Sequence, residues 1–541
     1  MDKLELIFLS FLIGGGLALV GIVWSYAKGL KQSPMDMWLM FIYNIVEYTA
    51  YASMNMALTL WLTADCGISD VGVGGYIMAW SIMLSIIAVL TGAIVDTIGI
   101  RKTLLISIIF LLISRFFMAW VTNPVLLFIT GFIPLAIGFA IVGPMISVAI
   151  KRYTTKETAA LGFGLFYVLM NLGFAGGGFL FDIVRGLFSV KDAAGKIINE
   201  NAGVTLVGIH FSTYQMFFVI GFGLTLISLV IAYFLKGSIE LNDAGEIVEI
   251  PKKELGSGFE AIKKSAVEVG TQMKEVAVEK IFWVYLGMLS LTLFVRFVFY
   301  HFSYTFPKYG ISVLGEGAKI GNVYGVLNPV LIIFIVPIVA YLTKKVSSYK
   351  MLIVGSLVSG GSTFIAAIPA SFFEPLTTST LGQLIFIKWL HLANSVADLT
   401  GANAPTPEYW PLIFFIFSFT IGEAIWSPRL MQFTAEIAPK GKEGTYIALS
   451  MLPWLLAKFF VGPMSGWLIH EYTPFEGGHP LPDNADHAMV WIWIGGMALI
   501  TPVALFVLGK PLLRILKVDG HGDDDIPSTE EAAVEEIVAD E

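Results

Sequence analysis

The stretch Gly92-Ala93-Ile94-Val95-Asp96-Thr97-Ile98-Gly99-Ile100-Arg101-Lys102 is a short charged turn between two long apolar runs, near residues 72–95 and 103–121. Each run holds roughly 20 predominantly apolar residues, the length that crosses the hydrocarbon core of a bilayer as a helix. A helix is the expected form because it satisfies its own backbone donors and acceptors inside the membrane. The stretch therefore predicts a tight connection between two transmembrane helices.

Similar apolar runs continue on both sides of this pair. They are 5–26, 38–63, 125–149, 159–181, 212–235, 282–304, 323–342, 351–371, 410–430, 445–470 and 488–509. Hydrophobic residues make up 56% of the 541 positions and charged residues only 14%, whereas soluble proteins carry about 25% charged residues. The composition excludes a soluble protein and predicts an all-α membrane protein with thirteen spans.

Lysine and arginine concentrate in alternate loops, as expected when cytoplasmic loops hold the basic excess. If the first run enters from outside, 22 of the 33 basic residues fall in inner loops and 7 in outer loops. We therefore expect a multi-pass protein of the bacterial inner (plasma) membrane, with the N-terminus outside and the C-terminus in the cytoplasm. The apolar segment 381–396 contains Lys388 and His391, and counting it as a span would reverse every later loop. We interpret this segment as interfacial or re-entrant.

A charged segment divides the chain into two sets of six spans. One extra span precedes the first set. The predicted units are an additional helix (1–31), a six-helix bundle (32–235), a cytoplasmic linker (236–280), a second six-helix bundle (281–511) and an acidic tail (512–541).

The linker and the tail have their own patterns. Apolar residues at helical spacing predict an amphipathic helix in the linker, and these residues are Phe259, Ile262, Ala266, Val269 and Met273. Residues 519–541 include ten acidic residues and no lysine or arginine, which indicates a solvated, disordered segment that could bind a cytoplasmic partner.

The turn quoted first resembles the signature loop of the major facilitator superfamily, G-x-x-x-D-x-x-G-x-R-K. Its fixed positions are Gly92, Asp96, Gly99, Arg101 and Lys102. The resemblance implies two six-helix bundles with a substrate site between them, and a conformational latch made by these residues. The corresponding place in the second half, 337–345, has lost the acidic residue, so only one latch is expected.

Three further stretches resemble motifs of the proton-dependent oligopeptide transporters, in the same order along the chain. They are Phe163-Gly-Leu-Phe-Tyr-Val-Leu-Met-Asn171-Leu-Gly173, Asn328-Pro-Val-Leu-Ile-Ile-Phe-Ile-Val-Pro337 and Gly422-Glu423-Ala-Ile-Trp-Ser-Pro428. The resemblance implies that Asn171, Asn328 and Glu423 contribute to substrate or proton binding. The alternative is a facilitator that uses Asn, Pro and Gly convergently.

The chain also departs from that family. The family's first core span carries E-x-x-E-R, whereas this chain has Asn44-Ile-Val-Glu47-Tyr48, without the first acid and the basic residue. Gly143 stands where the family has a lysine in its fourth span. These cations are the expected partners of a peptide carboxylate, so peptide recognition by that route is in doubt.

A polar stripe remains on the first core span. Asn44, Glu47, Tyr48, Tyr51 and Asn55 follow helical spacing and share one face. Ionisable groups inside a span normally face a cavity or another helix, because exposure to lipid costs several kcal/mol. Hydrogen bonding between helices is the alternative role for this stripe.

Four basic residues lie inside spans, and they are Arg115, Arg296, Arg429 and Lys458. Arg429 is near a span end and is expected to snorkel. Arg115 is expected to snorkel or to form a structural pair, and a functional role is the alternative. Lys458 needs a carboxylate or a wet cavity, and Glu423 is the nearest candidate by span order.

Arg296 on the seventh core span is expected to pair with Glu47 across the two bundles in at least one conformation. His301 follows about a turn and a half later, and could titrate near neutral pH. A structural histidine is the alternative.

These features predict a secondary active transporter that works by alternating access, with proton-coupled uptake of a small polar solute such as a short peptide. Glu47 or Glu423 would exchange the proton. The expected partners are the solute, protons and the lipid bilayer, with no nucleic acid, cofactor or metal. Cys66 is the sole cysteine, which argues against a cysteine-ligated metal centre. The sequence contains no nucleotide-binding loop and no catalytic motif that would indicate an enzyme. The alternative is a non-transporting membrane sensor or assembly protein on a transporter fold.

Overall fold

A computed structural model describes residues 3–516, apart from 156, 194–196, 238, 243–244, 250–262, most of 264–279, 344, 402–403, 438–451, 477–478 and 481–485. The five apolar residues that predicted a linker helix lie outside the described residues, as does the tail from residue 517 onward.

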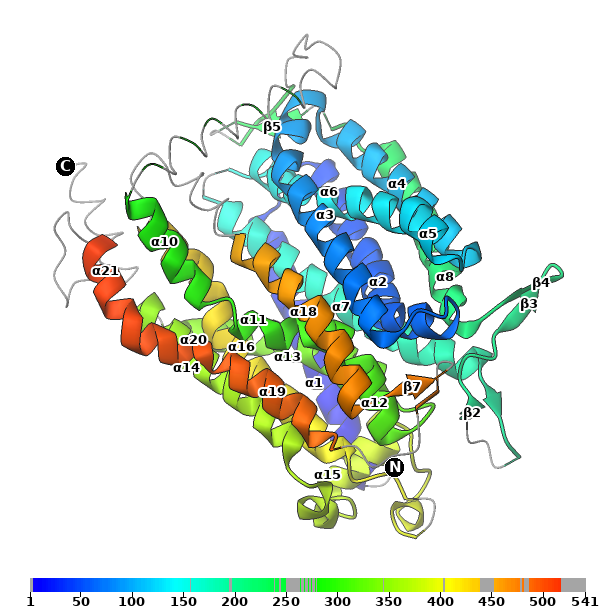
Figure 1. Ribbon diagram of the computed structural model, residues 1–541. Coiled ribbons are helices and arrows are strands. Elements are labelled where there is room, and N and C mark those ends of the chain that lie inside the picture. Colours follow the sequence, from blue (N-terminus) through cyan, green and yellow to red (C-terminus); the bar gives the residue numbers. More distant parts are fainter. Residues whose placement is uncertain are drawn as a thin grey trace.

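Six spans form the first bundle, coloured blue to cyan-green in Figure 1. They are α2 (Met35–Ala64), α3 (Asp70–Ile98), α4 (Ile100–Trp120), the continuous run α5 (Pro124–Leu127), η1 (Phe128–Phe132) and α6 (Ile133–Tyr153), then α7 (Ala159–Phe188) and α8 (Thr213–Phe234).

The second bundle lies beside the first and is coloured green to red (Figure 1). Its spans are α10 (Lys280–Leu291) with α11 (Val295–Tyr304) and α12 (Phe306–Leu314), η2 (Gly321–Val326) with α13 (Leu327–Leu342), α14 (Ser348–Ser362) with η3 (Thr363–Ala367), α16 (Tyr409–Ile437), α18 (Leu452–Tyr472), and α19 (Ala488–Ala498) with α20 (Ile500–Ala504), η8 (Leu505–Gly509) and α21 (Lys510–Leu516).

The predicted all-α membrane fold is confirmed. Among the described residues, ten helices are long and apolar enough to cross a membrane, and the pair α10 and α11, bent by 54°, makes an eleventh span. Helices α2 and α18 occupy the two remaining predicted runs. Helix α2 is 30 residues long, but its polar stripe lowers its hydropathy.

The segment 381–396 holds no long helix. It contains the end of α15 (Thr380–Gly382) and one π-helical stretch, η6 (Gln383–Trp389). At a rise of about 1.5 Å per residue these are too short to cross a bilayer, in agreement with the interpretation that the segment does not span. The neighbouring short turns are η4 (Ala370–Phe372), η5 (Glu374–Leu376) and η7 (Ala397–Leu399).

Short antiparallel hairpins mark the two ends of the bundles. Strands β1 (Val190–Lys191) and β2 (Ile197–Asn199), β3 (Val204–Leu206) and β4 (Ile209–Phe211), and β7 (Phe475–Glu476) and β8 (His479–Pro480) lie at one end, called here the hairpin end (Figure 1). Strands β5 (Ile239–Leu241) and β6 (Ile247–Glu249) lie at the opposite end, called here the linker end.

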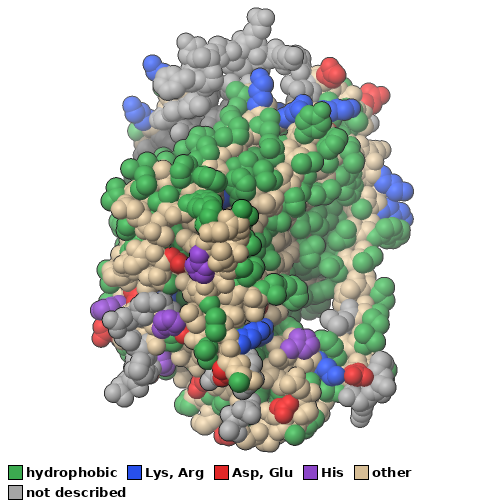
Figure 2. Space-filling view, turned by 90° about the vertical axis from the view of Figure 1, so that its right-hand side faces the viewer, with side chains coloured by type: hydrophobic (Ala, Val, Ile, Leu, Met, Phe, Trp, Pro, Cys, Tyr) green, Lys and Arg blue, Asp and Glu red, His purple; other side chains and the backbone are tan. Residues whose placement is uncertain are grey.

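Apolar side chains cover the outside of the molecule as a membrane protein requires. Figure 2 shows a broad hydrophobic band on one face, with charged side chains gathered above and below it. The additional helix α1 (Lys3–Gly29) runs along α7 and η6 and keeps its apolar side chains exposed; Leu17, for example, is 67% exposed.

Glycines bring the two bundles into backbone contact along two seams. A Cβ added at Gly74 on α3 would overlap the backbone of Gly462 on α18, and one added at Gly178 on α7 would overlap the backbone of Gly325 in η2. Small residues permit such close helix approach in membranes. The pairs α3–α18 and α7–η2 are therefore the seams that any relative motion of the bundles must repack.

Candidate functional site

Glu47 forms an ion pair inside the first bundle. Its Oε1 lies 2.5 Å from the guanidinium of Arg115 on α4, and both side chains are 0% exposed. Arg115 also donates to the Thr225 hydroxyl on α8 and, at 3.4 Å, to the Gly221 carbonyl. The predicted partner of Glu47, Arg296, lies in the other bundle and is not paired with it in this conformation. Burial beside Arg115 explains the difference, because that pair already neutralises the carboxylate.

Two other residues of the α2 stripe, Asn44 and Tyr51, make contacts within their own bundle. The Asn44 amide donates to the Phe166 carbonyl on α7 at 3.3 Å, which is a bond between helices. Tyr51 stacks on Phe139, with ring centroids 3.8 Å apart. Asn171 on α7 donates to the Tyr167 carbonyl of its own helix at 2.9 Å. The Asn44 bond agrees with the helix-contact alternative for that residue, and a binding role for the asparagines stays a prediction.

Tyrosines from both bundles meet between the bundles. Tyr51 interacts electrostatically with Tyr300, Tyr304 and Tyr324 of the second bundle. The second-bundle carboxylate Glu423 likewise interacts with Tyr167 of the first bundle and with Tyr324. We call the five tyrosines, Tyr51, Tyr167, Tyr300, Tyr304 and Tyr324, the central tyrosine cluster. Tyr300, Tyr304 and Tyr324 are three of 19 tyrosines in the chain, and no motif sets them apart in the sequence.

Glu423 on α16 is held beside this cluster by an asparagine from α13. Asn328 donates to Glu423 Oε2 at 2.9 Å and lies 2.9 Å from the Thr420 hydroxyl. Arg296 on α11 lies with its guanidinium carbon 5.0 Å from the centroid of the Trp426 ring and interacts electrostatically with Glu423. The structure thus brings together three predicted site residues, one from each of three helices.

Lys458 and His301 occupy different surroundings. The Lys458 ammonium lies 5.4 Å from the centroid of the Tyr300 ring, and no carboxylate of the described residues lies within 4.0 Å of it. The expected Glu423 partner bonds Asn328 instead. His301 is 0% exposed, and its Nδ1 lies 2.7 Å from the Thr305 hydroxyl. This contact favours the structural alternative for His301.

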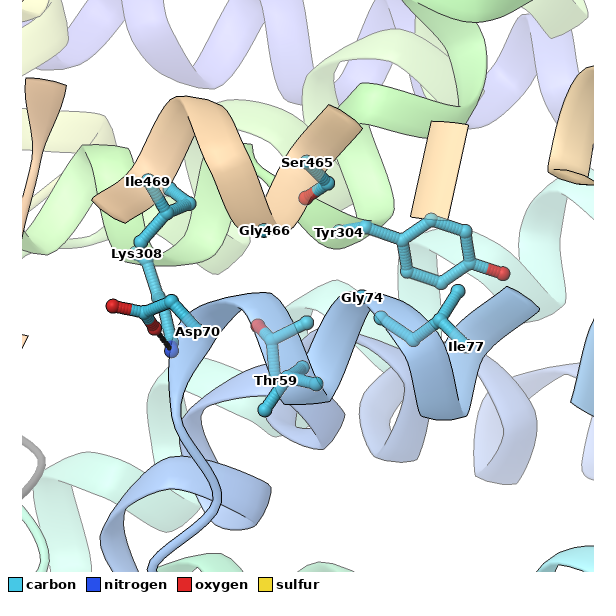
Figure 3. A pocket seen from close by; sticks show the side chains of 10 residues that line it. Thr59, Asp70, Gly74, Ile77, Tyr304, Lys308, Ser465, Gly466 and Ile469 are labelled. Carbon is cyan, nitrogen blue, oxygen red and sulfur yellow. Dashed lines mark hydrogen bonds and ion pairs between the residues drawn. The ribbon is translucent and has the colours of Figure 1, made fainter. Parts of the chain in front are cut away.

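An ion pair joins the two bundles at the hairpin end of the α3–α18 seam. Lys308 on α12 is 1% exposed and forms an ion pair with Asp70, and it also donates to the Thr63 hydroxyl. Figure 3 shows Lys308 reaching from the second bundle to Asp70 at the start of α3. The pair borders a small pocket, lined also by Thr59, Tyr304 and Ser465. Lys308 falls in an outer loop of the expected topology, a position that gives no sign of this contact in the sequence.

A second set of polar contacts joins the two bundles at the α7–η2 seam. Asp182 on α7 accepts hydrogen bonds from the backbone amides of Gly321 and Asn322, at 2.9 and 2.7 Å, and from the Asn322 side chain at 2.8 Å. One turn later, Arg185 pairs with Glu200 and donates to the Ala318 carbonyl at 2.8 Å. Both seams are therefore closed by buried polar bonds at the hairpin end.

The predicted latch lies at the linker end of α3. Gly99 joins α3 to α4 with a φ of 83°, a conformation that favours glycine. Arg101 donates to the Tyr233 carbonyl of α8 at 3.1 Å, and Lys102 is exposed. Gly92 and Asp96 lie within α3, but the Asp96 side chain is outside the described part, so its latching role stays a prediction.

Comparison with known proteins agrees with this architecture. The family model of the major facilitator superfamily matches residues 40–404, whereas no curated protein matches. Among solved structures, a transporter of the POT family in complex with 5-aminolevulinic acid has a TM-score of 0.59 at 14% identity, covering 88% of this chain and 97% of that chain.

Two further structures share the fold. A bacterial homologue of the human drug peptide transporters PepT1 and PepT2 has a TM-score of 0.57 at 14% identity, covering 89% of this chain and 99% of that one. The nucleoside transporter NupG has a TM-score of 0.54 at 14% identity, covering 87% and 99%. The family match spans more than half of the chain and agrees with its paired bundles, so this chain belongs to the major facilitator superfamily.

Proposed function

We propose that this chain is a proton-coupled secondary transporter that takes up a small polar solute, such as a short peptide, by alternating access. The supporting observation is the position of Glu423, which lies beside tyrosines contributed by both bundles. A solute bound there contacts both halves of the protein. The site can therefore respond to their relative motion, as alternating access requires.

Glu423 is the proposed proton carrier. Its hydrogen bond from Asn328 and its electrostatic interaction with Arg296 stabilise the charged carboxylate. A proton delivered to the carboxylate removes that charge, so Arg296 is released to interact with the solute or with solvent. Glu47 has a different role in this proposal, because Arg115 holds it away from the cluster. We assign the Glu47–Arg115 pair to stability.

The two closed seams define the step that must follow. Solute can reach the hairpin end only after Lys308 separates from Asp70 and Asp182 separates from η2. With the topology expected from the basic loops, the hairpin end is external and the closed seams belong to an inward-facing or occluded state. A topology reporter fused after Glu541 should then be active only in the cytoplasm. Activity on the external side would reverse the assignment.

The proposal is tested by uptake into proteoliposomes with an imposed inward proton gradient, for a panel that includes dipeptides and tripeptides. Glu423→Gln should lower gradient-driven accumulation at least about tenfold, as expected when a proton-transfer group is lost. Exchange of labelled for unlabelled solute without a gradient should persist, because it needs no net proton movement. Glu374→Gln, an exposed glutamate on η5, is the matched control.

Two results would contradict the proposal. Gradient-driven accumulation by Glu423→Gln at the wild-type level would remove Glu423 as the proton carrier. A folded wild-type protein that binds a solute of the panel and moves none of them would favour the sensor or assembly alternative.

A further inference from the structure

The second bundle carries more positive than negative charge beside the central tyrosine cluster. Its ionisable groups there are Arg296, Lys458 and Glu423. Glu423 interacts electrostatically with Arg296, so one cation and one anion are matched. Lys458 has no such match, since no carboxylate of the described chain lies within 4.0 Å of its ammonium.

The described carboxylates of the first bundle do not supply the missing anion. Its buried carboxylate near the middle of α2, Glu47, is 0% exposed and already paired with Arg115. An unmatched cation inside a span costs several kcal/mol unless water or an anion reaches it. A counter-ion for Lys458 must therefore come from outside the described part of the chain.

Both cations interact with one tyrosine. The Lys458 ammonium lies over the Tyr300 ring, and the guanidinium of Arg296, one helical turn earlier on α11, interacts electrostatically with the same tyrosine. The flat faces of Tyr300 and Trp426 support the two cations without neutralising them. Guanidinium and ammonium groups are the donors that recognise a carboxylate through charge-assisted hydrogen bonds.

We infer that Lys458 and Arg296 form an anion subsite, and that the transported solute carries a carboxylate which binds there. This inference rests on the proposed function, because it names the substrate class of the same site. The bound carboxylate supplies the charge that Lys458 lacks. Protonation of Glu423 releases Arg296 to bind the same carboxylate, which couples the proton to the anionic solute.

Binding to the purified, full-length protein tests the subsite without requiring transport. The probes are three pairs that differ only in charge: alanyl-alanine and its amide, propionate and propionamide, and glutarate and glutaramide. Each is added at about 10 mM, where a ligand with a millimolar Kd raises the melting temperature measurably. The carboxylate of at least one pair should raise the melting temperature, and its amide should not.

Variants locate the effect. Lys458→Gln should weaken binding of that carboxylate at least about tenfold, as for loss of one member of a buried charge pair, whereas Lys458→Arg should keep it within a few-fold. Lys388→Gln, which removes a half-buried lysine away from the site, is the matched control and should bind like wild type. Without ligand, Lys458→Gln should melt at or above the wild-type temperature, because it removes an unmatched cation.

The inference is overturned if no carboxylate stabilises the protein, if the amides stabilise it equally, or if Lys458→Gln binds as tightly as wild type. It is also overturned if ligand-free Lys458→Gln melts well below wild type, since that indicates a structural partner. Uptake separates this inference from the proposed function. If the protein transports an amide with the proton gradient and binds no carboxylate, the proposed function stands and the anion subsite is wrong. If it binds a carboxylate and transports no solute, the anion subsite stands and the proposed function is wrong.

Discussion

The two bundles differ in how their buried charges are neutralised. In the first bundle, Glu47 and Arg115 neutralise each other within one cluster of helices and are fully buried. In the second bundle, Arg296 and Lys458 lie on aromatic rings, and Glu423 accepts a hydrogen bond from an amide. A charge that is satisfied internally stabilises the fold but has little left to offer a ligand. The chemistry of the site is therefore expected to reside in the second bundle.

The largest effect should come from breaking the pair in the first bundle. Glu47→Gln leaves Arg115 buried without a counter-charge, and removing one member of such a pair typically costs about 3–5 kcal/mol. Glu423→Gln should cost less, because glutamine can still accept the hydrogen bond from Asn328 and Arg296 keeps its contact with the Trp426 ring. The measurement is thermal or denaturant unfolding of both purified variants, with Glu374→Gln as the exposed control.

A double variant tests whether Glu47 and Arg115 stabilise the fold as a pair. Replacing both partners, Glu47→Leu with Arg115→Met, should recover part of the lost stability, because no unpaired charge remains. Equal stability losses in Glu47→Gln and Glu423→Gln would contradict the division of roles between the bundles. Additive stability losses in a double-mutant cycle of Glu47→Leu and Arg115→Met would also contradict it, since residues in contact should couple.

A smaller effect is expected at the seam that joins the bundles. Lys308→Gln removes the ion pair with Asp70, and hydrogen bonds to charged groups contribute about 1.5–3 kcal/mol. The loss should shift the population toward states that are open at the hairpin end by roughly tenfold or more. Unlike the Glu47 pair, this one exists only while the two bundles are closed there, so its loss should alter conformation more than folding.

The sole cysteine reports this shift. Cys66 lies in the chain between Thr63 and Asp70, the two residues that hold Lys308. Burial, together with the nearby Asp65, raises the pKa of the Cys66 thiol to about 12. The reactive thiolate is therefore scarce at neutral pH. Opening should bring the pKa down toward its usual value and speed maleimide labelling in Lys308→Gln. Lys191→Gln, an exposed lysine of β1, is the control, and equal labelling in the two variants would count against the gate.

Much of the fold could be predicted from the sequence, because membrane spans are long and apolar. The thirteen runs correspond to helices, and the short segment around Lys388 does not span. The partner of Glu47 could not be predicted in the same way. Helical spacing shows which face of α2 is polar, but the rotation of α4 that brings Arg115 to that face depends on packing between helices.

The candidate site was predicted only in part for the same reason. Glu423, Asn328 and Arg296 carried motif or charge signals and lie together. His301 carried a charge signal as well, yet it bonds Thr305 inside its own bundle. Lys308 and Asp70 gave no signal, because charged residues are common at the ends of spans, where they usually meet water or lipid headgroups.

The smallest effect should come from the pair that attaches α1. Lys388 lies 3.4 Å from Glu5, and their side chains are 21% and 45% exposed. Exposed ion pairs contribute about 0–1 kcal/mol, because water and salt screen both charges. Lys388→Gln should therefore change the free energy of unfolding by no more than about 0.5 kcal/mol. The measurement is the same unfolding assay used for Glu47→Gln, at low and high salt. A loss close to that of Glu47→Gln would show that proximity of the charges, and not their burial, governs stability here. Such a result would contradict the special role assigned to the internal pair of the first bundle, since that pair would stabilise the protein no more than a pair at the surface.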